Sequence, residues 1–355
     1  MKTYLDKNVY EAALERIAYC FQEFDNVLVA FSGGKDSGVM LNLCYDYANE
    51  HGLLDKLTMY HLDYEAQYQM TTEYVTRTFL EQFPGIRKMW YCVPIKAQSA
   101  CALGEPYWTP WDAAKKKLWV RAMPENPYVV HEGNLDVPFR HGMVDYEFQD
   151  KLSRHFAKKR GTTAVMVGLR ADESLNRYAA VARGKKRRSY EGRKWITQTS
   201  AVTANVYPLY DWRVSDIWTA TARFGFDYNR LYDLLYQAGL TAGQMRVASP
   251  FNDCAQESLK LYKVIDPSNW ARMIGRVNGV NFTGLYGGTT AMGWKTIKLP
   301  PGHTWKSYYE FLLSTMDART AAHYNNILEK SKRYWMQGGT VDPGTADEVL
   351  AAYPL

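Results

Sequence analysis

The chain has 355 residues, which is enough for about two domains at roughly 150 residues each. Hydrophobic residues make up 46% of the sequence and charged residues 23%, a balance that supports a buried core and excludes a wholly disordered protein. The net charge of +6 is local, because residues 183–194 alone hold seven basic residues and one acidic residue. This excludes a protein that attracts polyanions over its whole surface.

The cysteine pattern disfavours a disulfide framework and a zinc ribbon. The five cysteines are odd in number and form neither a CxxC pair nor a cluster at metal-binding spacing. We therefore predict reduced thiols and no metal site built from the chain's own side chains. Acidic residues at positions 6, 11 and 15 are unlike a signal peptide, and no apolar run approaches the ~20 residues of a membrane helix. We expect a soluble, cytoplasmic protein without membrane contact.

Strand-like and helical patterns alternate over most of the chain. Residues 8–24 place apolar side chains on one helical face, and residues 26–31 (NVLVAF) form a continuous apolar run typical of a strand buried on both faces. The predicted strands are 26–31, 57–63, 89–95, 162–168 and 205–209, with helices at 8–24, 39–52 and 71–83. This alternation predicts an α/β fold with a doubly wound parallel sheet.

Two segments depart from the alternation. Residues 96–150 are rich in Trp and Pro and too long for a plain crossover, so we interpret them as an insertion that could cover the site. From about residue 241 the alternation stops, and helical patterns at 255–275 and 305–336 flank a glycine-rich loop at 283–293. We therefore predict a sheet domain over residues 1–240 and a helical C-terminal domain over residues 241–355.

The first predicted strand leads directly into a loop suited to phosphate. We call residues 32–37 the phosphate loop; it reads Ser32-Gly33-Gly34-Lys35-Asp36-Ser37. Two glycines allow close approach of the backbone, N–H groups at a helix N-terminus bind anions, and the hydroxyls and ammonium add donors. It is not a Walker A loop, because GxxxxGK[ST] is absent. The alternative is a tight turn in which Asp36 or Ser37 only caps the helix.

The phosphate loop resembles the SGGxDS signature of the PP-loop adenine-nucleotide alpha-hydrolase superfamily, and its lysine form resembles the phosphoadenosine phosphosulfate (PAPS) reductase-like branch. Residues 167–174 (VGLRADES) resemble that branch's G-x-R-x-x-E-S. The resemblance implies that Gly168 and Arg170 join the phosphate loop in binding the nucleotide, and that Glu173 orients Arg170 or a metal. The alternative is a surface ion pair between Arg170 and Glu173.

Asp63 ends the second predicted strand, where this fold usually places contacts to adenosine. The resemblance implies a nucleotide contact for Asp63. The branch's x-D-T-G reads Asp63-Tyr64-Glu65 here, which leaves the nucleotide open between ATP and PAPS.

Residues 207–218 (YPLYDWRVSDIW) resemble the branch's P-L-x-D-W-T-x-x-D-V-W. We interpret Trp212 and Trp218 as packing residues and Asp211 as adjacent to the site. Arg213 replaces the usual Thr before the helix, so we expect a different cap.

A sulfonucleotide reductase of this family carries its nucleophilic cysteine on a C-terminal E-C-G-L-H tail. This chain has no cysteine after Cys254, and the cysteine pairs that hold an iron–sulfur cluster in related enzymes are absent. We interpret Cys254 as a buried structural thiol, with a reactive thiol as the alternative. The resemblance therefore implies ATP cleavage between the α- and β-phosphates, with Lys35, Arg170 and Glu173 as catalytic residues and Mg²⁺ on the phosphates.

The C-terminal half resembles the domain of unknown function that follows the PP-loop domain in IbrA-like sulfurtransferase homologues. The resemblance rests on residues 245–259, 276–288 and 303–316 and on the Trp-rich insertion, so it spans nearly the whole chain. It implies a ParB/sulfiredoxin-like partner and a nucleic-acid modification, defence or regulatory system on a prophage or other mobile element. Two other functions stay open: a reductase or sulfurtransferase using Cys254, and a non-catalytic, nucleotide-gated regulator that binds DNA or a partner.

The basic cluster at 183–194 is a candidate nucleic-acid contact. Its core is formed by four consecutive residues, Lys185, Lys186, Arg187 and Arg188. Tyr190 and Trp195 beside it could stack on bases. The alternative is a solvated loop between the fourth and fifth strands.

Overall fold

The computed structural model describes residues 6–102, 104–182, 189–247, 249–256, 258–292 and 298–338. The chain divides into two compact units, Met1–Met292 and Gly293–Leu355. The domain boundary predicted at residue 240 lies inside the first unit and stays a prediction. Within the described residues, no helix is both long and apolar enough to cross a lipid bilayer.

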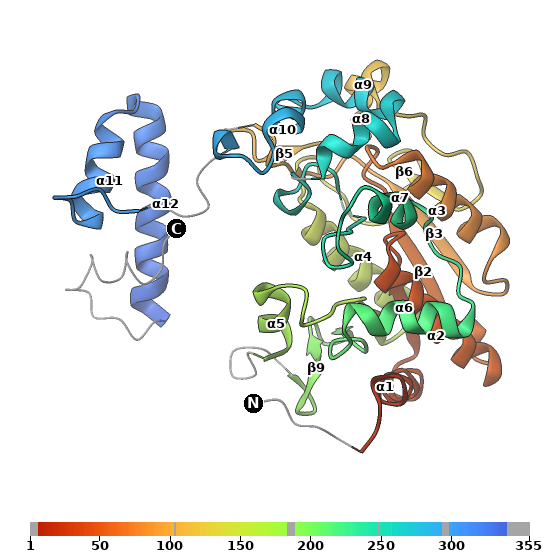
Figure 1. Ribbon diagram of the computed structural model, residues 1–355. Coiled ribbons are helices and arrows are strands. Elements are labelled where there is room, and N and C mark those ends of the chain that lie inside the picture. Colours follow the sequence, from red (N-terminus) through yellow and green to blue (C-terminus); the bar gives the residue numbers. More distant parts are fainter. Residues whose placement is uncertain are drawn as a thin grey trace. The chain divides into compact units, whose positions relative to one another are not determined.

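The first unit is built on a sheet in which eight described strands follow the order β6-β3-β2-β1-β7-β10-β9-β8. Two of its parallel neighbours, β2 and β3, are labelled side by side in Figure 1. The strands are β1 (Asn26–Ala30), β2 (Leu57–Leu62), β3 (Arg87–Cys92), β6 (Val129–His131), β7 (Thr163–Met166), β8 (Ser189–Tyr190), β9 (Arg193–Gln198) and β10 (Thr203–Val206). Neighbouring strands from β6 to β10 are parallel, while β9 and β8 are added antiparallel. The predicted α/β fold with a doubly wound parallel sheet is confirmed, and the antiparallel strands β9 and β8 extend it at one edge.

The position of β1 makes the end of that strand a natural binding site. β1 pairs with β2 on one side and with β7 on the other. The strand order therefore reverses beside β1, and ligands of open α/β sheets bind at the carboxyl ends of strands where this happens. The phosphate loop follows β1, and the motif containing Arg170 follows β7.

The helices of the first unit are α1 (Val9–Glu23), α2 (Lys35–Glu50), α3 (Gln69–Glu81), α4 (Asp145–Arg160), α5 (Leu175–Ala182), α6 (Val214–Phe224), α7 (Leu231–Gln237), α8 (Tyr262–Ile265), α9 (Pro267–Arg276) and α10 (Val280–Tyr286). Short 3₁₀ turns occur at η1 (Leu54–Lys56), η2 (Ala113–Leu118), η3 (Asp253–Ala255), η4 (Leu259–Leu261) and η5 (Thr290–Met292), and β4 (Ala97–Gln98) pairs with β5 (Tyr107–Trp108). The helical pattern at 255–275 corresponds to several short helices, η3, η4, α8 and α9, rather than to one. Asp266 caps a new helix that begins at Pro267, because its carboxylate accepts from the Asn269 N–H at 3.2 Å.

The connection between β7 and β10, where a solvated loop was one alternative for residues 183–194, contains regular structure. It contains α5 and the β8–β9 hairpin, and β9 pairs with β10. Ile196 of β9 is buried and joins the core of the sheet. The high charge of the segment hid this apolar contact from the sequence pattern. β10 itself spans Thr203–Val206 rather than 205–209.

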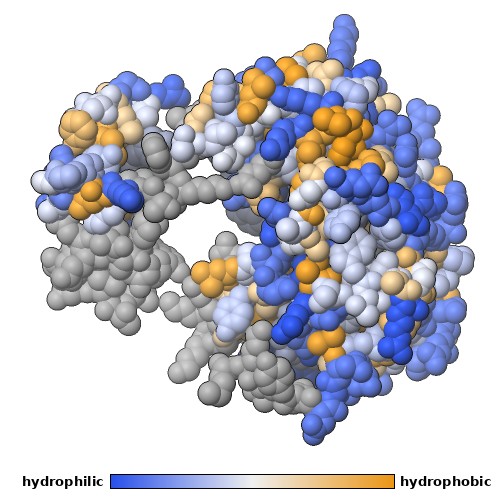
Figure 2. Space-filling model, in the orientation of Figure 1, coloured by the Kyte–Doolittle hydropathy of each residue, from blue (hydrophilic) through white to orange (hydrophobic). Residues whose placement is uncertain are grey.

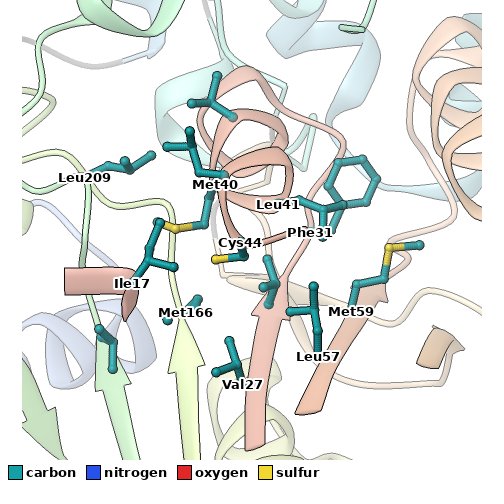
Figure 3. Packing of buried hydrophobic residues seen from close by; sticks show 14 of the residues in the cluster. Ile17, Val27, Phe31, Met40, Leu41, Cys44, Leu57, Met59, Met166 and Leu209 are labelled. Atoms are coloured by element: carbon teal, nitrogen blue, oxygen red, sulfur yellow. The ribbon is translucent and has the colours of Figure 1, made fainter. Parts of the chain in front are cut away.

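The core fixes α2 against the sheet and thereby positions the phosphate loop. Met40 and Cys44 of α2 are fully buried, as are Val27 of β1 and Met166 of β7. Figure 3 shows the two α2 side chains facing the strands, with Ile17 of α1 beside them. Burial of each such side chain stabilises the fold by about 1.5–3 kcal/mol. Hydrophilic residues cover most of the face of the first unit seen in Figure 2.

The described part of the second unit contains α11 (Trp305–Ser314) and α12 (Ala318–Gly338). Thr304 caps α11 by accepting from the Ser307 N–H at 3.1 Å. The helical pattern at 305–336 thus corresponds to two helices, α11 and α12. Leu328 of α12 is buried, whereas Phe311 and Ile327 are exposed.

Candidate functional site

The phosphate loop is a preformed turn tied together by its two serines. Ser37 Oγ accepts from the Ser32 N–H at 3.1 Å and lies 2.9 Å from Ser32 Oγ. Gly33 has φ +75°, and a Cβ there would lie 2.9 Å from Val75 Cγ2, so only glycine fits without strain. Gly34 is the N-cap of α2, and no side chain caps the helix. The capping alternative for Asp36 and Ser37 is therefore not what the structure shows.

Two buried cations meet at the N-terminus of α2. Lys35 Nζ lies 3.3 Å from Asp36 Oδ2, and the Arg170 guanidinium, brought there by the end of β7, donates to Asp36 Oδ1 and to Asp172. Lys35 and Arg170 are 7% and 3% exposed. Burial alone would lower the pKa of Arg170, but Asp36 and Asp172 raise it above its ordinary value, so the guanidinium stays charged.

Gly168 allows the chain after β7 to approach the N-terminus of α2 closely. A Cβ at Gly168 would lie 3.0 Å from the Ser37 backbone nitrogen and 3.1 Å from the Asp36 carbonyl carbon. A larger residue would separate the end of β7 from the start of α2. The glycine thus brings the Arg170 segment to the phosphate loop.

Glu173 does not contact Arg170 through its side chain. Its carboxylate lies 3.1 Å from Arg177 Nε and 3.6 Å from Arg246 NH1. Neither a surface ion pair with Arg170 nor direct orientation of Arg170 is therefore seen. Glu173 instead joins the motif at 167–174 to Arg246, far along the chain.

Asp63 is at the end of β2 as predicted, but its carboxylate is fully buried and already bonded. Trp90 Nε1 donates to Oδ2 at 2.8 Å, the Glu65 N–H donates to Oδ1 at 2.8 Å, and Arg121 NH2 lies 2.6 Å from Oδ1. Burial acts to raise the pKa of Asp63, yet the charge of Arg121 and these hydrogen bonds hold it below its ordinary value. Arg121 comes from the Trp-rich insertion, which therefore packs over the end of β2.

A second buried carboxylate beside it was not foreseen. Glu65 is fully buried and has φ +64°. Its oxygens accept from Arg276 Nε at 2.9 Å and NH2 at 3.0 Å, and from the Trp111 N–H at 2.7 Å. The change from Thr-Gly to Tyr64-Glu65 in the motif after Asp63 is the sequence signal that marks this position.

The residues of the 207–218 motif pack rather than line the site. Trp212 is buried and donates to the Val9 carbonyl at 2.9 Å, and Trp218 packs edge-on against Tyr232. Both packing predictions are confirmed. Asp211, expected beside the site, instead forms a 2.7 Å ion pair with Arg16 of α1.

All five cysteines lie in the described part of the chain and carry free thiols. The interpretation of Cys254 as a buried thiol is wrong, because it is exposed in η3 while the other four are buried. Phe251, three residues earlier, is the side chain that enters the core. In the described residues, no three or more His, Cys, Asp or Glu side chains are grouped to hold a metal ion.

The four basic residues Lys185, Lys186, Arg187 and Arg188 lie outside the described residues. The neighbouring aromatic residues do not point to base stacking. Tyr190 packs against Phe24 with ring centroids 5.3 Å apart, and Trp195 meets Tyr19 edge-on at 5.8 Å. Both rings help to fasten the β8–β9 hairpin to α1.

Two family models match this chain, one after the other. The family model of the phosphoadenosine phosphosulfate reductase domain matches residues 26–238. The chain belongs to this family. A model of a domain of unknown function, DUF3440, matches residues 239–354. The uncharacterized protein YbdN of Escherichia coli K12 is 34% identical over 353 residues, which cover 98% of this chain and 85% of YbdN.

Solved structures with a similar fold are much more distant in sequence. PAPS reductase from Candida auris, in a phosphate complex, is 12% identical with a TM-score of 0.35, covering 66% of this chain and 93% of that one. The U34-tRNA thiolase NcsA from Methanococcus maripaludis is 13% identical with a TM-score of 0.35, covering 79% and 82%.

Proposed function

We propose that the phosphate loop binds the polyphosphate of an adenine nucleotide and that the protein cleaves ATP between its α- and β-phosphates. The observation that carries this proposal is the convergence of Lys35 and Arg170 at the N-terminus of α2. A helix N-terminus, a glycine with positive φ and two buried cations together suit a polyanion better than any neutral ligand. Membership of the PAPS reductase domain family supports an adenine nucleotide.

The chemistry is adenylyl transfer. A nucleophile on the acceptor attacks the α-phosphorus, the bond from that phosphorus to the α,β-bridging oxygen breaks, and pyrophosphate leaves with both electrons of the bond. Lys35 holds the leaving pyrophosphate, and Arg170 stabilises the charge that develops around the α-phosphate. Bound together with the nucleotide, Mg²⁺ would supply further neutralisation of the phosphate charge. Asp36 keeps Lys35 and Arg170 oriented. Glu173 ties the segment that carries Arg170 to Arg246, and Asp63 shapes the end of β2 without touching the nucleotide.

Product analysis tests this proposal. ATP labelled in the α- and γ-phosphates is incubated with the protein, Mg²⁺ and a metabolite extract as the source of acceptor. We expect AMP or an adenylylated acceptor together with pyrophosphate. Steady release of ADP and phosphate would contradict the mechanism, and Lys35→Ala serves as the inactive control.

A thiol mechanism at Cys254 is the second candidate, favoured by one observation. Cys254 is exposed, and the next residue, Ala255, lines a small pocket with Thr71 and Arg246 beside the phosphate loop. If sulfur chemistry uses this thiol, Cys254→Ser abolishes it, because a hydroxyl is a far poorer nucleophile than a thiolate. We expect the variant to keep nucleotide binding and most activity. Complete loss of activity in a folded variant would replace adenylyl transfer by thiol chemistry.

We also propose that the basic cluster at 183–194 brings a nucleic acid to this site, in the manner expected of an IbrA-like protein with a ParB/sulfiredoxin-like partner. The support is the charge of the segment and its place in the connection after the Arg170 motif. A regulator that binds nucleotide and DNA without catalysis would show the same binding but no pyrophosphate release.

A further inference from the structure

One stretch of chain that the motifs do not include lies directly on the phosphate loop. We call residues 229–247 the covering segment; it contains α7 and the turns that follow. Asn229, which is buried, donates from Nδ2 to the Gly33 carbonyl at 3.3 Å. At its other end, the Val247 carbonyl oxygen would lie 3.9 Å from a Cβ placed on Gly34. The covering segment therefore contacts both glycines of the loop.

The covering segment accepts hydrogen bonds from two Lys35 donors that a bound phosphate would use. The Lys35 N–H, the first N–H of α2, donates to the Tyr232 hydroxyl at 3.0 Å. The Lys35 ammonium donates to the Met245 carbonyl at 3.2 Å and lies 5.3 Å from the centre of the Tyr232 ring. An anion at a helix N-terminus binds through these groups. The Tyr232 hydroxyl and the Met245 carbonyl oxygen thus occupy the positions in which Lys35 would hold phosphate oxygens.

An ion pair joins the covering segment to the motif at 167–174. Arg246 NH2 donates to the Glu173 carbonyl at 3.2 Å, and its NH1 lies 3.6 Å from the Glu173 carboxylate. Tyr232 is 2% exposed and packs against Trp218. The covering segment is thus anchored at α7 through Tyr232 and at the turn after α7 through Arg246.

We propose that the covering segment is a gate that occupies the anion site of the phosphate loop, and that polyphosphate binds by displacing the Tyr232 hydroxyl and the Met245 carbonyl. This inference rests on the proposed function. The Lys35 N–H cannot donate a full hydrogen bond to the Tyr232 hydroxyl and to a phosphate oxygen at once, so these two acceptors compete for it. Displacement also frees Arg246 and Glu173 from each other, which couples opening to the motif that carries Arg170.

The test compares Tyr232→Phe with Tyr236→Phe, a control on the same helix whose residue is 71% exposed. Pyrophosphate and Mg-ATP are titrated by calorimetry. Tyr232→Phe keeps the ring but frees the Lys35 N–H, so we expect about five-fold tighter binding of both ligands, the effect of removing one competing hydrogen bond. Arg246→Gln is expected to tighten binding in the same direction. Weaker or unchanged binding by a folded Tyr232→Phe would show that the hydroxyl is a ligand or a bystander and would overturn the gate.

Hydrogen exchange gives a second, independent readout. Amides of α7 are expected to exchange faster when pyrophosphate is added to the wild-type protein, because the covering segment is displaced. Unchanged or slower exchange with bound pyrophosphate would overturn displacement while leaving the phosphate site standing. If no variant binds either ligand, the proposed function itself fails, and the gate with it.

Discussion

Glu65 and Arg276 form a buried ion pair between residues that are 211 positions apart in the sequence. Glu65 belongs to the region matched by the reductase domain, and Arg276 to the region matched by DUF3440. Both guanidinium bonds to the carboxylate are 3.0 Å or shorter, and Arg276 also donates to the Thr109 carbonyl at 2.6 Å. The pair therefore joins α9, the insertion and the loop after β2 within the first unit.

Breaking this pair on one side is expected to destabilise the first unit strongly. Arg276→Met leaves the Glu65 carboxylate buried without its charge partner, which costs about 3–5 kcal/mol. The double variant Glu65→Gln/Arg276→Met should recover part of that loss, because it removes the uncompensated charge. Urea unfolding measures the free energy of unfolding of the single and the double variant. Lys159→Gln, in an exposed ion pair with Asp136, is the control and should cost less than about 1 kcal/mol. Equal losses for the buried and exposed pairs would contradict the structural role.

The Asp63–Arg121 pair predicts a definite pH dependence. In the wild type the pKa of Asp63 is held low, so its contribution to stability is present above the unfolded value of about 4 and is lost only as pH falls through the lower folded pKa. In Arg121→Gln the guanidinium charge no longer opposes burial, and only His61 and the hydrogen bonds from Trp90 and the Glu65 N–H remain, so we expect the pKa of Asp63 to rise. That variant then gains stability from this group as pH falls from neutral toward 4.

The stability difference between wild type and Arg121→Gln should therefore be largest near neutral pH and shrink on acidification. Urea unfolding at a series of pH values measures it. Arg230→Gln, in an exposed pair with Asp233, is the control and should show a small, nearly constant difference. A pH-independent difference for Arg121→Gln would show that Arg121 does not set the ionisation of Asp63.

Arg170→Ala is expected to lower the rate of ATP cleavage more than it lowers nucleotide affinity. Its charge matters most as negative charge redistributes around the α-phosphate, and losing one such group costs roughly 10²–10³-fold in kcat. Single-turnover kinetics and calorimetry separate the two effects. Arg177→Ala, which removes a partly exposed partner of Glu173, is the control. A loss confined to affinity would make Arg170 a binding residue only.

The basic cluster predicts salt-dependent binding of nucleic acid. Replacing Lys185, Lys186, Arg187 and Arg188 by Ser should flatten the dependence of log affinity on log salt, with ATP binding retained. The slope should change by about 0.9 for each phosphate of duplex DNA that the variant no longer neutralises. The matched control replaces four basic residues of α4, namely Lys151, Lys158, Lys159 and Arg160. DNA affinity and salt slope like those of wild type in the cluster variant would identify a solvated loop.

The sequence was sufficient to place the phosphate loop and Arg170 together. Each follows a run of buried apolar residues, and β1 and β7 are parallel neighbours whose carboxyl ends share one edge. Gly168 was assigned to the nucleotide, whereas the structure shows its contact with the α2 backbone. That contact depends on the distance between two strand ends, which no local pattern records.

The partners of the site residues could not be predicted in the same way. Arg121 reaches Asp63 from a long insertion without periodicity, and the covering segment contacts Lys35 partly through a main-chain carbonyl, which has no sequence signature. Arg276 offered one signal, since it shares the buried face of α9 with Trp270 and Met273. A charged residue on an apolar helix face predicts a buried partner, although not its identity.

The most direct test of the account is calorimetric titration of ATP into the double variant Lys35→Ala/Ser37→Ala. The matched control is Lys151→Ala/Ser153→Ala on α4, where Ser153 is also buried. Equal thermal stability of the two double variants establishes that both are folded. We predict that the phosphate-loop variant loses most of its ATP affinity and the α4 variant keeps it. ATP binding by the phosphate-loop variant as tight as that of wild type would contradict the assignment of residues 32–37 as the nucleotide site.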